Sequence, residues 1–143
     1  TEKLEIPKQL DALLNLGNDT IKYEHEGEVG NCLLTMFVYD DGEEDGDSVS
    51  IIFDGQVLVD NQKLRLKDNG PIRRQLALAS GNPNYIVAKA WNTGRTGLNT
   101  MRKDIYEGDI PDEKHLRGKK PILSKILHAR PGQASGIILR CNW

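Results

Sequence analysis

The 143-residue sequence predicts an antiparallel β-sandwich with one short helix at its start. Short apolar runs recur along the chain, Gly, Asn, Asp or Pro bounds each run, and several runs alternate between apolar and polar residues. This spacing is typical of sandwiches and barrels. The length suits one hydrophobic core, and we therefore expect a single domain over residues 1–143.

The only helical pattern lies near the start of the chain. Leucines are spaced to share one helix face, a proline precedes them at a first-turn position, and a glycine follows as a stop. These residues are Pro7, Leu10, Leu13, Leu14, Leu16 and Gly17. They predict a helix over 7–16 within an N-terminal helical segment, 1–19.

The remaining apolar runs predict nine strands. Residues 48–53 alternate cleanly, and Asp54-Gly55 after them is a strong hairpin signal because a type I′ turn needs two residues with positive φ. The nearly continuous apolar run 32–38 predicts a central strand that is covered on both faces. The predicted strands are 20–26, 32–39, 48–53, 56–60, 72–79, 85–91, 100–106, 123–129 and 136–141.

The two cysteines lie at opposite ends of the predicted sandwich. Cys32 begins the first strong strand and Cys141 lies in the last. If those strands are neighbours, a disulfide would close a loop of over a hundred residues and stabilise the fold by roughly 4–5 kcal/mol. Two separate buried thiols are the alternative.

Several turn-rich pieces of the sequence form a pattern in which an apolar strand ends in an acidic Asp-Gly-Asp loop and a later strand runs into Ala-x-Asn-x-Gly and Asn-Thr. These pieces are Phe37–Gly42, Asp45–Ser50, Phe53–Gly55, Ala90–Gly94, Asn99–Thr100 and Arg130–Gly136. With the strands placed, the chain resembles a β-sandwich domain common in exported bacterial proteins, especially those of Bacteroidetes. One departure from that group is that the prolines common before Asn-Thr are absent. The resemblance implies an extracytoplasmic, non-enzymatic binding or accessory module.

Six of the eight residues from Asp40 to Asp47 are acidic. Clustered carboxylates repel one another unless water, salt or a cation screens them, and calcium suits such oxygens. An EF-hand is excluded because Ile52 stands where a bidentate Glu is needed. A sandwich-type calcium site with Asp41, Asp45 and Asp47 as ligands is predicted. The alternative is a solvated acidic turn.

Residues 91–100 combine an aromatic ring, amides, a guanidinium and glycines. That mixture suits a carbohydrate, because the ring covers a sugar face while the polar groups bond its hydroxyls. The candidate ligand-binding residues are Trp91, Asn92, Arg95 and Asn99. A structural corner with Trp91 in the core is the alternative.

The stretch 107–121 predicts a long surface loop, and positive charge begins within it. From Arg102 to Arg140 the chain holds nine Lys and Arg against five acids, whereas Glu24 to Asp60 holds no Lys or Arg. The loop is therefore a candidate site for an acidic partner, through Arg117, Lys119 and Lys120. A solvated loop is the alternative.

The net charge of −2 argues against general nucleic-acid binding, and no apolar run is long enough to span a membrane. No nucleophile elbow, phosphate loop or metal-protease motif appears. A nucleophilic Cys141 with His128 as base is less favoured than a buried, inert cysteine. We therefore expect that the protein is not an enzyme. We expect an exported module that binds a glycan or a surface and has calcium as a cofactor. The alternative is an assembly module that docks an acidic protein. The sequence does not set the oligomeric state.

Overall fold

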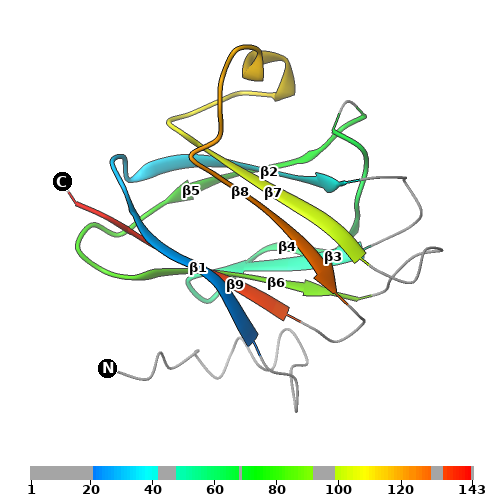
Figure 1. Ribbon diagram of the computed structural model, residues 1–143, viewed down its shortest axis with the longest axis horizontal. Helices are drawn as coiled ribbons and strands as arrows, with labels where there is room; N and C mark the ends of the chain where they lie inside the picture. Colours follow the sequence, from blue (N-terminus) through cyan, green and yellow to red (C-terminus); the bar gives the residue numbers. More distant parts are fainter. Residues whose placement is uncertain (1–20, 42–47, 68, 92–98, 130–133, 143) are drawn as a thin grey trace.

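The computed structural model describes residues 21–41, 48–67, 69–91, 99–129 and 134–142. This part of the chain forms nine strands and one 3-10 helix (Figure 1). The helix predicted over 7–16 lies outside the described residues. The elements are β1 (Ile21–Val29), β2 (Leu33–Asp40), β3 (Ser48–Phe53), β4 (Gln56–Lys63), β5 (Ile72–Ala77), β6 (Asn84–Ala90), β7 (Asn99–Glu107), η1 (Glu113–Leu116), β8 (Leu123–Ala129) and β9 (Ala134–Cys141).

The strands form two layers that pack face to face, and the predicted β-sandwich is confirmed. One sheet has the order β1-β9-β6-β3-β4, and the other has the order β5-β2-β7-β8. All pairs are antiparallel except β1 and β9, which run parallel. No helix in the described part of the chain is long and apolar enough to cross a membrane.

The predicted strand bounds are close to the observed ones. The ranges 48–53 and 123–129 agree with β3 and β8, and the largest differences are three residues, at the ends of β1 and β4. The predicted hairpin is also present, because Asp54 and Gly55 join β3 to β4 with φ angles of +47° and +85°. Both residues thus adopt the positive φ that a type I′ turn requires.

β2 is buried on both faces, as its continuous apolar sequence predicted. Leu34, Met36 and Val38 pack into the core between the sheets. The other face carries Phe37, which packs with Tyr106 and with two residues of the β7–β8 connection. The second sheet covers one face of β2 and the β7–β8 connection covers the other, which explains its apolar character.

A disulfide joins Cys32 to Cys141, with their Cα atoms 5.3 Å apart. Cys32 precedes β2 and Cys141 ends β9, so the bond links strands of different sheets rather than neighbours in one sheet. Of the two alternatives for the cysteines, the structure contains the bridge.

Cationic side chains cross between the sheets at both open sides of the sandwich. On one side, Arg74 of β5 donates from Nε to the carbonyl of Leu58 on β4 at 2.9 Å. On the other side, Lys103 of β7 contacts Oε1 of Glu24 on β1 and donates to Oγ of Ser135 on β9 at 3.1 Å. Lys103 is 1% exposed, and burial lowers its pKa although Glu24 opposes that shift.

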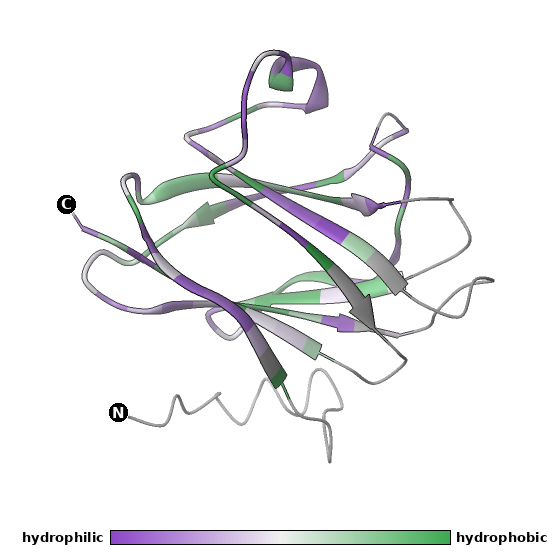
Figure 2. Cartoon of the chain, in the orientation of Figure 1, coloured by the Kyte–Doolittle hydropathy of each residue, from purple (hydrophilic) through white to green (hydrophobic). Residues whose placement is uncertain are grey.

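The β7–β8 connection is more ordered than the surface loop that was predicted. It contains η1, and its Ile110 and Leu116 are buried against Phe37 and Tyr106 on the outer face of the four-stranded sheet. Its sequence is nevertheless mainly polar (Figure 2), and residues 117–120 are exposed as expected. Two buried apolar residues thus pack a mainly polar segment against the sheet.

Candidate functional site

The β7–β8 connection and the end of β7 enclose a pocket of about 230 Å³. The pocket lies at the edge of the four-stranded sheet and combines apolar, basic and acidic side chains. Its lining residues are Tyr106, Glu107, Ile110, Lys119, Lys120 and Ile122. Two of the three residues predicted to bind an acidic partner therefore lie at the same hollow.

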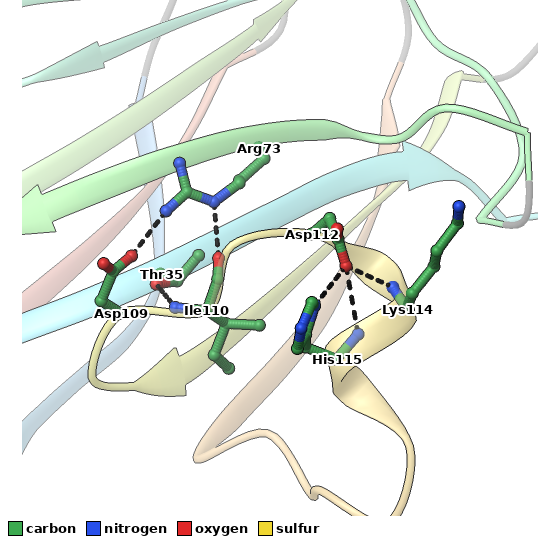
Figure 3. A network of polar contacts seen from close by, with 7 residues as sticks. All are labelled: Thr35, Arg73, Asp109, Ile110, Asp112, Lys114 and His115. Atoms are coloured by element: carbon green, nitrogen blue, oxygen red, sulfur yellow. Dashed lines mark hydrogen bonds and ion pairs between the residues drawn. The ribbon is translucent and has the colours of Figure 1, made fainter.

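The start of the connection is tied to β2 through Thr35. Its hydroxyl donates to the carbonyl of Gly108 at 2.7 Å and accepts from the amide of Ile110 at 3.0 Å. Thr35 is fully buried, and its bond to the Ile110 amide satisfies a backbone donor in a buried setting. They fix Ile110 in the pocket wall (Figure 3).

Arg73 of β5 holds the same segment from the far side of β2. Its guanidinium donates from Nε to the carbonyl of Ile110 at 2.6 Å and from Nη2 to Asp109 at 2.7 Å. The pocket wall is thus bonded to β2 and β5 together (Figure 3).

Asp112 caps η1 beside this anchor. Its Oδ1 accepts from the amides of Lys114 and His115 at 3.0 and 3.2 Å, and it contacts the His115 ring at 2.6 Å. This contact with the histidine lowers the pKa of Asp112. Serine, threonine, asparagine and aspartate favour such cap positions because their side-chain oxygens bond free amides.

Lys119 and Lys120 follow η1 through a tight turn. Gly118 has a φ of +79°, which a residue with a side chain rarely adopts, and the amide of Lys119 donates to the carbonyl of Leu116 at 2.9 Å. The turn brings both lysines to the pocket, while Arg117 is exposed beside them and does not line it. The arrangement can bind an anionic group beside an apolar one.

Ile122 is the apolar residue at the open rim of this pocket. It is 40% exposed, whereas Ile110 and Tyr106 are buried. An exposed apolar side chain beside a pocket indicates a contact site more often than an isolated one elsewhere on the surface does. Ile122 therefore extends the candidate surface. The sequence did not predict Ile122, Ile110 and Tyr106 as site residues, since only the fold brings β7 and the connection together.

The predicted sugar-binding residues are only partly described. Trp91 donates from Nε1 to Oγ of Ser50 at 2.5 Å, and Nζ of Lys89 lies 5.0 Å from its ring centroid. Its indole therefore makes contacts within the fold, and Trp91 is half-buried rather than in the core. Asn92 and Arg95 lie outside the described residues, and Asn99 begins β7 opposite Ala129. Glycan binding here stays a prediction.

Of the three predicted calcium ligands, only Asp41 lies in the described residues. Asp41 accepts from Nε of Arg102 at 3.0 Å, and this guanidinium competes with a cation for the carboxylate. Asp45 and Asp47 lie outside the described residues. No cluster of three or more His, Cys, Asp or Glu suited to a metal occurs in the part that the structure describes. Calcium stays a prediction.

The alternative of a nucleophilic Cys141 is overturned. Cys141 is bonded to Cys32 and therefore has no thiol to ionise.

A buried carboxylate lies on the outer face of the same sheet, and sequence reasoning missed it. Asp104 of β7 accepts from the Tyr39 hydroxyl at 2.7 Å and from the Ser124 hydroxyl at 2.5 Å. Ser124 also accepts from Nη1 of Arg102 at 2.8 Å. Burial and the bond to Asp104 raise the pKa of Tyr39. This network ties β8 to β7 and β2.

No protein-family model, curated protein or solved structure matches the chain. The resemblance to the exported bacterial domain stays a prediction. Function is therefore inferred from the chemistry of the residues around the pocket.

Proposed function

We propose that this protein is a non-enzymatic, exported binding module that docks an acidic protein partner at the pocket of the β7–β8 connection. One observation carries the proposal: Lys119 and Lys120 lie at a hollow whose other walls are apolar except for Glu107, so positive charge outnumbers negative charge there. Complementary charge directs a partner to such a surface, and apolar contact in the hollow holds it.

Two further observations support it. The connection is bonded to β2 and β5 by Thr35 and Arg73, so little ordering is needed when a partner arrives. The disulfide between Cys32 and Cys141 agrees with an exported protein, because such bonds persist mainly in oxidising compartments.

The proposal can be tested with a displayed library of random nine-residue peptides. We expect the selected peptides to be enriched in Asp and Glu. We also expect them to bind the variant Lys119→Glu/Lys120→Glu at least about tenfold more weakly, because two attractions become repulsions and 1.4 kcal/mol corresponds to a factor of ten. Affinity should fall with salt.

A matched control reverses two exposed lysines elsewhere. Lys63→Glu/Lys67→Glu makes the same change in net charge away from the pocket, and it should leave binding within about twofold at physiological salt. Selected peptides without acidic enrichment, or equal losses in the two variants, would refute the proposed function.

A further inference from the structure

β8 is the most regular of the four edge strands of the sandwich. The strands at the sheet edges are β1, β4, β5 and β8. β1 has one shift of register and β4 has two, with a positive φ at Asn61. β5 is six residues long and follows Pro71. Irregular, short and proline-bearing edges resist pairing with another chain.

β8, in contrast, pairs with β7 over seven residues without a shift of register. A regular edge of this kind presents unpaired backbone groups to a partner. It is therefore the edge that is best suited to strand addition.

The ladder identifies which backbone groups of β8 face the open edge. The amide of Gly108 donates to the carbonyl of Leu33, so the even-numbered residues of β7 bond to β2. In an antiparallel sheet, the backbone N–H and C=O groups of successive residues point to opposite sides of the strand. The backbone groups of Lys103 and Ile105 therefore bond to β8.

The register then fixes the alternation within β8 itself. Lys103 and Ile105 are opposite Lys125 and Leu123. The N–H and C=O groups of Ser124 and Ile126 therefore point away from β7. Within the described part of the chain, no other strand or backbone group bonds to them.

The charge beside this edge indicates which kind of strand can pair with it. Lys119 and Lys120 precede β8, and Lys125 lies within it. A second copy of β8 would bring the same cations together and be repelled, whereas an acidic segment would be attracted. Ile122, at 40% exposure, links the edge to the pocket.

We propose that the acidic partner binds as an extended segment that adds a strand to the free edge of β8, with its acidic side chains at Lys119 and Lys120 and an apolar one in the pocket. This inference rests on the proposed function, and it adds the binding mode. Backbone bonds to Ser124 and Ile126 supply a strand-shaped site, and the pocket and lysines select the side chains.

The test uses the acidic nine-residue peptides selected from the library. Every second amide of an added strand points to β8. Two N-methylated forms of one peptide are therefore compared, one methylated at the odd-numbered residues of the peptide and the other at the even-numbered residues. We expect one form to lose binding at least tenfold and the other to keep it within about threefold. Hydrogen exchange at the amides of Ser124 and Ile126 should slow when the unmethylated peptide binds.

The outcomes separate this inference from the proposed function. Acidic peptides that bind equally in both methylated forms, without protection of Ser124 and Ile126, overturn strand addition and leave docking at the lysines intact. A library without acidic binders overturns both. Self-association that is lost in Lys119→Glu/Lys120→Glu assigns the edge to a second copy of this chain and also overturns the inference.

Discussion

Cys32 and Cys141 join the two sheets of the sandwich across 109 residues of chain. Cys32 leads into the central strand β2, and Cys141 ends β9, which lies between β1 and β6. A cross-link of this span restricts the unfolded chain strongly, because closing a longer loop removes more conformational entropy.

We predict that reduction of this disulfide lowers the free energy of unfolding by about 4–5 kcal/mol in the chain-entropy model. Urea unfolding with and without reductant measures the change. The double variant Cys32→Ser/Cys141→Ser should match the reduced protein and should not respond to reductant. An intact mass with two free thiols in native protein would contradict the bridge.

Much of the fold followed from local patterns in the sequence. Alternation in 48–53 predicted β3, Asp54-Gly55 predicted its hairpin, and the apolar run 32–38 predicted a strand buried on both faces, all of which the structure contains. These features depend on residues close together in the chain, where side-chain period and turn chemistry determine the conformation.

The candidate site was predicted only in part, because its walls come from distant positions. Lys119 and Lys120 were predicted from their charge, but the bond between Thr35 and Ile110 spans 75 residues and the contact between Lys103 and Glu24 spans 79. No local pattern in the sequence predicts either of these two contacts. A polar segment that is fixed by two buried residues, Ile110 and Leu116, is indistinguishable from a free loop in the sequence alone.

The contact between Lys103 and Glu24 predicts an asymmetric response to substitution. Glu24→Gln leaves a buried ammonium without its counter-charge, and we expect a loss of about 2–3 kcal/mol, at the low end for buried pairs because the Glu24 side chain is 16% exposed. Lys103→Met removes the buried charge, and we expect a change within about 1 kcal/mol.

Glu26→Gln is the matched control on the same strand. Glu26 pairs with Arg140, and its side chain is 57% exposed, so its loss should cost less than about 1 kcal/mol. Denaturant unfolding of the three variants measures all of these changes. Equal losses in Glu24→Gln and Glu26→Gln would show that the contact of Lys103 contributes little.

The burial of Lys103 also affects how the free energy of unfolding depends on pH in the alkaline range. Burial lowers its pKa from the usual 10.5. Between the folded value and 10.5, the unfolded chain binds the proton and the folded chain does not, so this residue favours folding more as pH rises through that window.

We therefore compare the free energy of unfolding of the native protein with that of Lys103→Met. We predict that the difference, native minus variant, becomes more positive from neutral pH toward pH 10.5. Taking the difference cancels the tyrosines, which titrate in both proteins. Unfolding measured at several pH values tests the slope. A flat or falling difference would contradict a lowered pKa for Lys103.

The pair of Asp41 with Arg102 makes the calcium hypothesis testable. If Asp41 is a ligand, the ion must displace the guanidinium, so Arg102→Ala should bind calcium more tightly than the native protein. Thermal melting with calcium measures this, because a ligand at 100 times its Kd adds about 2.7 kcal/mol to the folded state. The absence of a shift in both proteins at millimolar calcium would remove calcium as a cofactor.

Thr35 connects the stability of the fold to the shape of the candidate pocket. Thr35→Val keeps the side-chain volume but leaves the amide of Ile110 and the carbonyl of Gly108 without their hydroxyl partner. We predict a loss of about 1–3 kcal/mol in the free energy of unfolding, since the Ile110 amide is left unsatisfied in a buried setting and the Gly108 carbonyl in a part-buried one. Peptide affinity at the pocket should also fall, because Ile110 forms its wall. Thr35→Ser retains the hydroxyl and should retain most of the affinity. A Thr35→Val protein that is destabilised but binds acidic peptides normally would show that the pocket does not depend on this anchor.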